Sequence, residues 1–143
     1  MRIRKSVGAF LFNKKGKVLL VIHPRGNGYY NIPKGGVEEG ETLKEALRRE
    51  LKEELSIDNF GKIINLDLSF GFKLPEDLRI KKGADYQEVK MFYVEFLGDE
   101  EEIKPDNDEI SWAGFVSTEE FFDKVPFEET KNLFRKFLES RII

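Results

Sequence analysis

The chain contains no cysteine, one histidine, one tryptophan and two methionines in 143 residues. Without cysteine it can form neither a disulfide nor a thiolate metal site, and this composition fits a reducing cytoplasm. No apolar run is long enough to cross a bilayer, and residues 1–6 lead into a predicted strand instead of forming a signal peptide. A formal net charge of only −3 also lacks the strongly basic character of proteins that grip nucleic acid mainly through phosphates. We therefore expect a cytoplasmic protein without a membrane segment.

Apolar residues are nevertheless plentiful, at 40% of the chain with 13 phenylalanines. A chain of this length can bury a hydrophobic core without disulfides or other covalent links. Charged residues reach 36%, and both signs are interspersed along the chain. No repeat, linker or shift in composition divides it. We predict one domain that spans residues 1–143.

Strands are predicted where β-branched and aromatic residues run together, at residues 7–12, 17–23, 62–69, 89–97 and 110–116, with a hairpin turn at residues 13–16. Residues 89–97 are almost continuously apolar, which indicates a strand buried on both faces. Trp112 is expected in the core. Ser117 and Glu120 form a capping box that opens a short helix. A closing amphipathic helix is predicted over residues 126–141, with its inward face formed by Phe127, Leu133, Phe134, Phe137 and Leu138.

A further helix is predicted from Leu43 to Leu55, with Thr42 and Glu45 as its capping box. Its apolar residues recur at helical spacing and share one face: Leu43, Ala46, Leu47, Leu51 and Leu55. Strands around a central helix, followed by a terminal helix, predict an α/β fold in which a mixed sheet lies between helical layers.

Glu50 and Glu54 project from inside that apolar stripe, and Arg49 and Glu53 lie on its border. Desolvating an unpaired carboxylate costs several kcal/mol, and two carboxylates one turn apart also repel each other. Arg49 could neutralise one of them but not all three glutamates. A hard divalent cation such as Mg²⁺ could, because it prefers oxygen ligands. The alternative is a solvated helix of mixed charge, for which these glutamates lie on the wrong face.

The stretch from Gly35 to Ile57 resembles the Nudix box, whose pattern is G-x5-E-x7-R-E-U-x-E-E-x-G-U, with U a bulky aliphatic residue. The positions that match at the required spacing are Gly35, Glu41, Arg49, Glu50, Leu51, Glu53, Glu54 and Ile57. Ser56 stands where the family has its second glycine. A left-handed backbone there is easier for glycine than for serine. If this structure departs from the family's, we therefore expect the departure at the exit of the helix.

This resemblance implies a Nudix-type α/β/α sandwich that hydrolyses a nucleoside diphosphate linked to another moiety. It implies Mg²⁺ as the cofactor, with Mn²⁺ as an alternative, bound by Glu50, Glu53, Glu54 and the carbonyl of Gly35. Glu50 or a neighbour would help to activate water, and Arg49 would pair with Glu41 to hold the loop against the helix. Related enzymes also use a glutamate outside the box, for which Glu109 is the candidate. Its alternative role is that of an ordinary exposed acidic residue.

Three functions compete on the remaining sequence. The segments NIPKGGVEEGE, KLPEDL, YQEVKMFYVEFLG and DEISWAGFVSTEE resemble parts of diadenosine polyphosphate hydrolases and of bacterial RNA 5′-pyrophosphohydrolases. Two positions depart from these enzymes: Lys34 replaces a glutamine that is common in the RNA enzymes, and Tyr86 replaces a glycine. We expect a dinucleoside polyphosphate hydrolase acting on a substrate such as diadenosine tetraphosphate. The alternatives are an RNA 5′-pyrophosphohydrolase and a non-catalytic nucleotide-sensing module, which would not need the clustered glutamates.

Residues 72–88 form a long polar stretch, which is interpreted as a loop that selects the substrate. The predicted substrate-binding residues are Lys34, Arg79, Lys81, Lys82 and Tyr86. Basic residues there could meet distal phosphates, and Tyr86 or Phe72 could stack on a base. A groove that also includes Arg2, Arg4 and Lys5 would suit an RNA end, whereas a solvated connector is the alternative. His23 is expected at a strand end beside the site. We also expect the protein to be a monomer or a homodimer.

Overall fold

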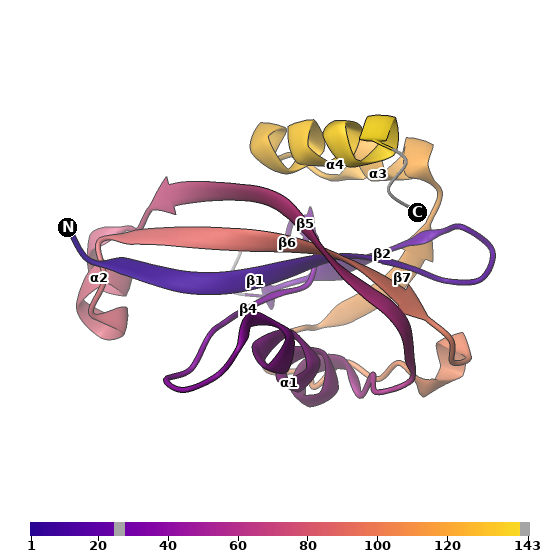
Figure 1. The fold of residues 1–143 in the computed structure, drawn as a ribbon, viewed down its shortest axis with the longest axis horizontal. Helices are drawn as coiled ribbons and strands as arrows, with labels where there is room; N and C mark the ends of the chain where they lie inside the picture. The colour runs from indigo at the N-terminus through magenta and orange to yellow at the C-terminus, as the bar shows by residue number, and fades with distance from the viewer. Residues whose placement is uncertain (25–27, 141–143) are drawn as a thin grey trace.

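The computed structural model describes residues 1–24 and 28–140 (Figure 1). The strands are β1 (Ile3–Phe12), β2 (Val18–Ile22), β3 (Tyr30–Asn31), β4 (Lys34–Gly36), β5 (Phe60–Lys73), β6 (Tyr86–Phe96) and β7 (Trp112–Val116). The helices are α1 (Leu43–Leu55), α2 (Glu76–Lys82), the 3₁₀ helix η2 (Glu100–Glu102), α3 (Thr118–Lys124) and α4 (Glu128–Ser140). No helix in these ranges is long and apolar enough to cross a membrane.

The strands form a sheet in the order β3-β2-β1-β6-β5, and β4 pairs with β1 while β7 pairs with β2. β1 and β6 run parallel, from the pair Ile3 and Tyr86 to the pair Phe12 and Glu95. The other pairings are antiparallel. The predicted mixed sheet is therefore confirmed, with β1 near its centre.

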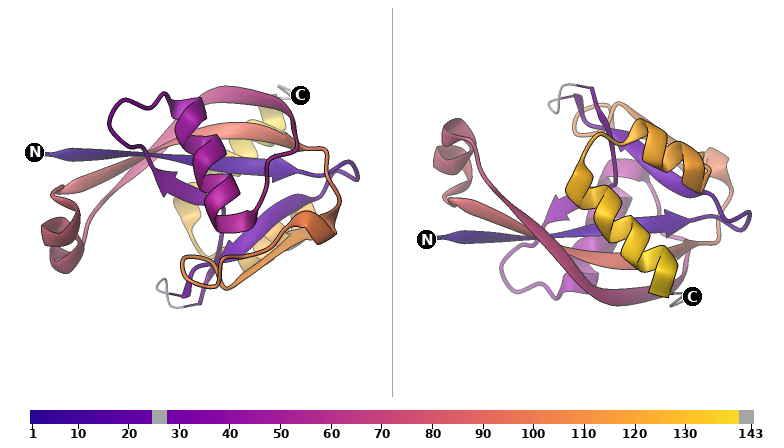
Figure 2. Two further views of the ribbon diagram at one scale, coloured as in Figure 1. Left: turned by 90° about the horizontal axis from the view of Figure 1, so that it is seen from below. Right: turned by 90° about the horizontal axis from the view of Figure 1, so that it is seen from above.

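Helices cover both faces of this sheet (Figures 1 and 2). Alternate residues of β1 explain how, because successive side chains of a strand point to opposite faces. Phe10 and Phe12 pack in the cluster that contains the buried apolar residues of α3 and α4. Val7, Ala9 and Leu11 pack in a second cluster, which contains the buried face of α1. The fold is the predicted α/β/α sandwich.

Helix α1 follows its predicted pattern from cap to exit. The hydroxyl of Thr42 accepts from the N–H of Glu45 at 3.1 Å, and the Glu45 carboxylate accepts from the N–H of Thr42 at 2.9 Å. At the other end Ser56 adopts a left-handed backbone with φ 61°. Ser56 thus adopts the backbone conformation that a glycine would adopt at this position. For a residue with a side chain this conformation costs about 1 kcal/mol.

The prediction of a loop over residues 72–88 is wrong. Strand β5 extends to Lys73, α2 follows, and β6 begins at Tyr86. Helix α2 contains no buried residue, so it has no apolar stripe by which its sequence could reveal it. Strand β1 likewise begins at Ile3, earlier than predicted. Its first residues are polar apart from Ile3, which is itself exposed, so they carry no apolar alternation that would predict a strand.

Three aromatic or aliphatic side chains predicted in the core are exposed. Trp112 is 40% exposed and packs edge-on against Tyr30, with 5.5 Å between the ring centroids. Phe127 is 38% exposed because α4 begins only after it, so the helical periodicity does not apply to it. Leu138 is also partly exposed, at the border of the stripe. The other predicted core residues of α4 are buried: Leu133, Phe134 and Phe137.

Candidate active site

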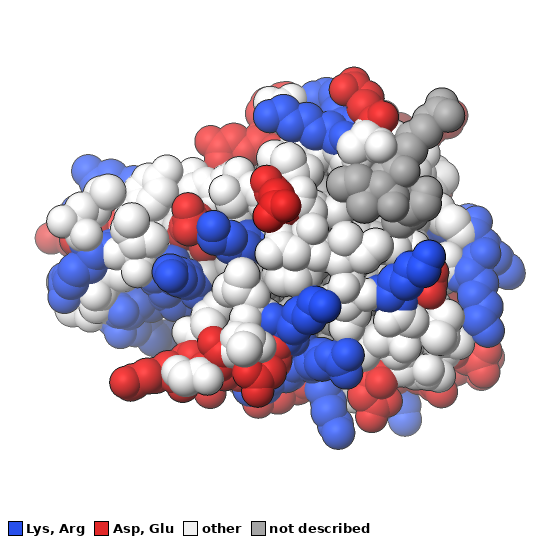
Figure 3. Space-filling view, in the orientation of Figure 1, with Lys and Arg blue, Asp and Glu red and all other residues white. Residues whose placement is uncertain are grey.

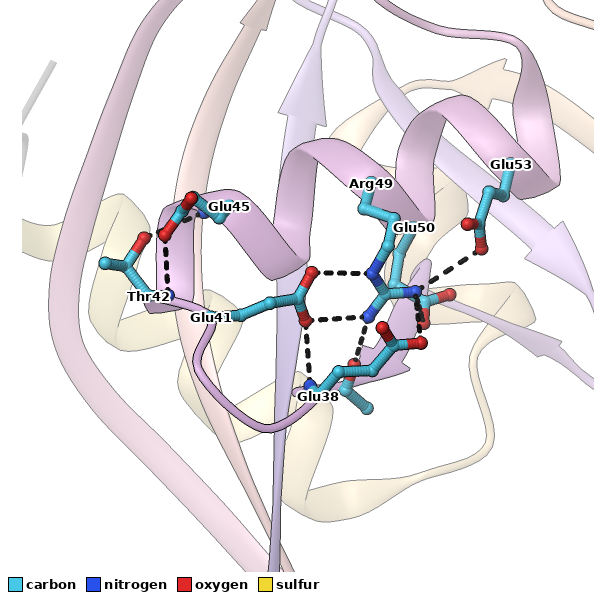
Figure 4. A network of polar contacts seen from close by, with 8 residues as sticks. Glu38, Glu41, Thr42, Glu45, Arg49, Glu50 and Glu53 are labelled. Carbon is cyan, nitrogen blue, oxygen red and sulfur yellow. Dashed lines mark hydrogen bonds and ion pairs between the residues drawn. The ribbon is translucent and has the colours of Figure 1, made fainter.

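Arg49 ties the loop that precedes α1 to the helix itself (Figure 4). Its Nε donates to Glu41 at 2.7 Å and its Nη2 donates to the other Glu41 oxygen at 3.0 Å. Glu41 also accepts from the backbone N–H of Glu38 at 2.8 Å. These bonds lower the pKa of Glu41, with the Arg49 hydrogen bond as the main cause. The pair implied by the Nudix resemblance is therefore present as a bidentate, charge-assisted contact.

The same guanidinium reaches β4 and two further glutamates. Its Nη2 donates to the carbonyl of Gly36 at 2.8 Å, and its Nη1 donates to Glu50 at 2.9 Å and to Glu53 at 3.3 Å. The hydrogen bond to Glu41 is the main reason that the pKa of Arg49 is raised. Arg49 is thus a fixed cation that joins a strand, a loop and a helix.

Gly35 is required by the position of Glu50. A side chain at Gly35 would overlap the Glu50 carboxyl group, which lies against the glycine backbone. Both residues line one cavity. The sequence spacing of Gly35 and Glu50 therefore brings a backbone segment and a carboxylate into direct contact.

Glu54 is the most buried of the box glutamates, at 9% exposed. Burial, followed by the neighbouring carboxyl of Glu50 and the charges of Glu109 and Asp106, raises the pKa of Glu54 to about 9. Such crowding of acidic groups is unfavourable unless a proton or a cation offsets it.

A turn at residues 106–110 brings Glu109 to this cluster. The carboxylate of Asp106 accepts from the backbone N–H groups of Glu109 at 3.1 Å and Ile110 at 2.9 Å. The N–H of Asp106 donates to the carbonyl of Glu54 at 2.9 Å, and His23 Nδ1 bonds to the Glu109 carbonyl at 3.1 Å. His23 follows β2 beside the site, as predicted. Asp106 was not predicted, although an Asp followed by other turn-forming polar residues is a signal for such a turn.

The donor set fits the metal that the resemblance implies. Glu50, Glu54 and Glu109 offer carboxylate oxygens, the ligands that Mg²⁺ prefers, and their mutual repulsion favours a cation. In the described part of the chain, no group of three acidic or histidine side chains is already arranged to hold a metal ion. Arg49 holds an oxygen of Glu50 and an oxygen of Glu53.

A cavity of about 1140 Å³ opens beside these groups. The predicted metal ligands all line it: Gly35, Glu50, Glu53, Glu54 and Glu109. Of the predicted substrate-binding residues, Lys34 and Lys82 line the cavity, whereas Arg79, Lys81 and Tyr86 do not. The Tyr86 ring instead covers Gly71 on the neighbouring strand, where a side chain at Gly71 would overlap it.

The two lysines give the cavity a cationic side. The pKa of Lys34 is lowered by burial and then by the charge of Lys82. The pKa of Lys82 is lowered by burial and then by the charge of Arg4, which also lines the cavity. Figure 3 shows basic side chains gathered over the α2 end of the molecule and acidic ones over the loop before α1. The site therefore has an acidic and a basic side.

Two aromatic pairs complete the lining of the cavity. Phe70 and Phe72 stack on β5 with 6.3 Å between their centroids, and the Lys34 ammonium lies 5.5 Å from the Phe72 ring. Tyr29 and Phe127 meet edge-on at 6.1 Å. Tyr29 immediately precedes β3, so the pairs come from opposite edges of the sheet. Sequence reasoning missed Tyr29 and assigned Phe127 to the core.

The chain matches the NUDIX domain family over residues 2–138. It belongs to the Nudix family. An RNA pyrophosphohydrolase from Pelagibacter ubique is 35% identical over 129 residues, which cover 86% of this chain and 82% of the relative. The fold also resembles the E. coli dihydroneopterin triphosphate pyrophosphohydrolase (TM-score 0.78, 19% identity, 95% of each chain covered). It likewise resembles a C. elegans Ap4A hydrolase (TM-score 0.74, 23% identity, 95% of this chain and 96% of that one).

This Nudix chain is a hydrolase that acts on pyrophosphate bonds. Members of the family act on nucleoside polyphosphates and generally use divalent metal ions. The matched region contains the entire box, and therefore both partners of the Arg49 and Glu41 contact.

Proposed function

We propose that this Nudix protein is an Mg²⁺-dependent pyrophosphohydrolase that cleaves a phosphoanhydride bond in a dinucleoside polyphosphate such as diadenosine tetraphosphate. The observation that carries this proposal is one cavity with acidic and basic sides and aromatic pairs from opposite sheet edges. Its volume of about 1140 Å³ exceeds the roughly 300–1,000 Å³ of common small-ligand pockets. Two bases joined by several phosphates would use all of these surfaces.

Glu50, Glu53, Glu54, Glu109 and the carbonyl of Gly35 would hold the cation. Bound there, it would neutralise phosphate charge and polarise a phosphoryl oxygen. Glu50 or a neighbouring glutamate would accept the proton of the attacking water, since these carboxylates line the cavity.

Arg49 and Glu41 act on the substrate only through geometry. Their bidentate contact, together with the bond from Arg49 to the Gly36 carbonyl, keeps β4 at a fixed distance from α1. Gly35 and Glu50 are thereby held together on the wall of the cavity. We assign Arg49 and Glu41 a positioning role.

The basic side of the cavity would meet the phosphates beyond the cleaved bond. Lys34 and Lys82 supply the charge, and the stacked rings of Phe70 and Phe72 lie next to Lys34. One base would contact these rings and the second base would contact Tyr29 or Phe127, because a base can stack on any exposed aromatic face.

RNA 5′-pyrophosphohydrolysis is the second candidate. The Pelagibacter ubique relative, 35% identical, bears the name RNA pyrophosphohydrolase. The basic surface over α2 in Figure 3 would suit an RNA 5′ end. A non-catalytic nucleotide sensor is disfavoured, because relatives of 30–35% identity bear the name RNA pyrophosphohydrolase and the box glutamates are intact.

Product analysis tests the two candidates. Purified protein with Mg²⁺ is given diadenosine tetraphosphate, a 5′-triphosphorylated RNA oligonucleotide and ATP at equal concentrations, and products are separated by chromatography. We expect ATP and AMP from diadenosine tetraphosphate, with the highest kcat/KM of the three. Preferential release of phosphates from the RNA end would replace the first candidate by the second. No cleavage of any substrate with Mg²⁺ or Mn²⁺ would exclude both.

A melting experiment tests the cofactor without activity. Because acidic groups crowd around Glu54, a bound cation should stabilise the native state by ligand linkage, by about 2.7 kcal/mol at a concentration 100 times its Kd. Tm should rise with Mg²⁺ and with Mn²⁺, and the larger rise identifies the tighter metal. A Tm indifferent to both would contradict the site. The cytoplasmic location, the single domain and a monomeric or dimeric state stay predictions.

A further inference from the structure

Arg4 occupies an unusual position on β1. Its neighbours Ile3 and Lys5 are exposed, whereas Arg4 is half-buried and lines the cavity. It lies directly opposite Gln87 in the parallel pairing of β1 with β6. Its Nη1 donates to the Gln87 side-chain oxygen at 3.1 Å. The guanidinium is thus held by a side chain of the neighbouring strand that also lines the cavity.

A buried polar chain fixes the orientation of Gln87. Gln87 is 7% exposed, and its Nε2 donates to the Ser6 hydroxyl at 3.2 Å. Ser6 is fully buried and donates to the carbonyl of Glu88 at 3.1 Å. Because a buried donor without a partner is costly, the amide nitrogen must face Ser6 and the amide oxygen must face Arg4.

Gly36 is the second residue against which the Arg4 guanidinium packs. A side chain at Gly36 would overlap the Arg4 guanidinium, so the guanidinium lies against the backbone of β4. The backbone of Gly36 is not in the left-handed region, so conformation alone does not require glycine there. The absence of a side chain serves the close approach of Arg4.

The charge of Arg4 has no acidic partner in the described residues, since none of their carboxylates forms an ion pair with it. Gln87, the side chain to which it donates a hydrogen bond, is neutral. The charge of Lys82 lies close enough for Arg4 to lower the Lys82 pKa. A guanidinium held by a neutral acceptor keeps its other N–H donors for an anion, and its planar fork matches phosphate oxygens.

We propose that Arg4 binds the phosphate chain of the substrate, and that Gln87 and Ser6 are positioning residues that hold its guanidinium over Gly36. This inference rests on the proposed function for the polyphosphate nature of the substrate, but not on which bond is cleaved. A purely structural network between β1 and β6 is the competing explanation. It predicts lost stability without a specific loss of phosphate binding.

Arg4→Gln is the first test, with Lys14→Gln in the turn after β1 as the control that removes the same charge. Binding of inorganic tripolyphosphate is measured by calorimetry without metal, and KM and kcat are measured with diadenosine tetraphosphate. We expect Arg4→Gln to weaken tripolyphosphate binding about 10- to 100-fold. KM should rise by a similar factor while kcat changes far less, and Lys14→Gln should match wild type.

Gln87→Met tests the positioning role by a double-mutant cycle. If Gln87 acts through Arg4, Gln87→Met should raise KM about fivefold in the wild type but add almost nothing to Arg4→Gln. Gly36→Ala serves where Gln87→Met fails to fold. It leaves the Ser6 and Gln87 network intact, displaces the guanidinium, and should reproduce the KM effect of Arg4→Gln.

Unchanged tripolyphosphate affinity in Arg4→Gln overturns the proposal. A loss from Gln87→Met or Gly36→Ala that is equal in both backgrounds overturns the positioning role. A wild-type protein that binds tripolyphosphate through Arg4 but cleaves no nucleotide would support this inference and refute the proposed function. Cleavage of nucleotides that is indifferent to Arg4 would do the reverse.

Discussion

The acidic and basic sides of the cavity are assembled in different ways. On the acidic side, three of the glutamates that would hold the cation, Glu50, Glu53 and Glu54, come from the stretch between Gly35 and Ile57, and Glu109 comes from the turn at residues 106–110. The basic side takes Arg4 from β1, Lys34 from β4 and Lys82 from α2. Groups that perform the chemistry are therefore encoded locally, whereas groups that would choose the substrate are gathered by the fold.

The difference has a physical origin. Helical spacing places Glu50 and Glu54 one turn apart wherever α1 lies, so their proximity does not depend on the rest of the chain. Arg4 approaches the site only because β1 pairs in parallel with β6 and in antiparallel with β4. Substitutions on the acidic side should thus affect the chemical step, and substitutions on the basic side should affect binding.

The largest effect is expected from Glu54→Gln. The amide keeps the volume of the side chain but removes the buried charge that would hold the cation. Since replacing even an outer partner of a metal ligand costs about 10- to 100-fold, kcat should fall by roughly 10²-fold or more. Steady-state kinetics at saturating Mg²⁺ measures this loss.

Glu39→Gln is the control, because Glu39 is an exposed residue of the loop before α1. Glu54→Gln should melt at or above the Tm of the metal-free wild type, since it relieves repulsion from Glu50. It should also lose the rise in Tm with Mg²⁺. Near wild-type kcat in Glu54→Gln would show that the chemistry does not depend on this carboxylate.

A second, smaller effect is expected from Arg49→Lys, which keeps the charge but loses the planar fork. Losing the bidentate contact with Glu41 and the bond to Gly36 should cost about 1–3 kcal/mol, which corresponds to a Tm lower by roughly 3–10 °C. Displacement of β4 from α1 should lower kcat between about 10- and 100-fold. The measurements are thermal melting and steady-state kinetics.

Arg48→Lys is the matched control, because Arg48 is the preceding residue of α1 and is exposed. It should change neither Tm nor kcat appreciably. If Arg49→Lys retained both values as well, the clamp would be dispensable and the acidic side would not need its fixed geometry.

Local patterns predicted the acidic side well. The capping box of Thr42 and Glu45 and the apolar face of α1 are present as the pattern predicted, and the contact of Arg49 with Glu41 is present as the Nudix resemblance implied. Each depends on residues fewer than about ten positions apart, where helical geometry and charge leave few arrangements. Asp106 escaped prediction because its proximity to Glu54 depends on a backbone bond between distant segments.

Local patterns predicted the wrong structure where tertiary contacts decide it. Helix α2 buries no side chain, so its residues carry no periodic signal and were interpreted as a loop. Phe127 and Trp112 are apolar and were assigned to the core, yet both are more than a third exposed. Phe127 lies beside the cavity, where exposure of a large aromatic ring suits ligand binding, which local hydrophobicity does not reveal.

The aromatic pairs offer a third prediction, which separates binding from chemistry. Phe127→Ala and Phe70→Ala should each raise KM for diadenosine tetraphosphate, by about tenfold if each ring stacks on a base with about 1–3 kcal/mol. kcat should change far less, because neither ring lies among the carboxylates. Steady-state kinetics over a range of substrate concentrations measures both values.

Trp112→Ala is the control for exposed aromatic area, since Trp112 is 40% exposed but does not line the cavity. Its KM should stay near that of the wild type. If Phe127→Ala raised KM and Phe70→Ala did not, one base alone would be bound, and a substrate with a single nucleoside would then be favoured over a dinucleoside polyphosphate.

The smallest effect distinguishes two adjacent lysines of α2. Both side chains are exposed, but Lys82 lines the cavity and its pKa is lowered by burial and by the charge of Arg4, whereas Lys81 does not line the cavity. Single contacts of partly exposed charges contribute about 0.2–1 kcal/mol, so Lys82→Ala should raise KM roughly two- to fivefold, and added salt should reduce the difference. Lys81→Ala should leave KM unchanged. Equal rises in both variants would mean that α2 attracts the substrate by its net charge, and the basic side would then lack the specific geometry that distinguishes it from a charged surface.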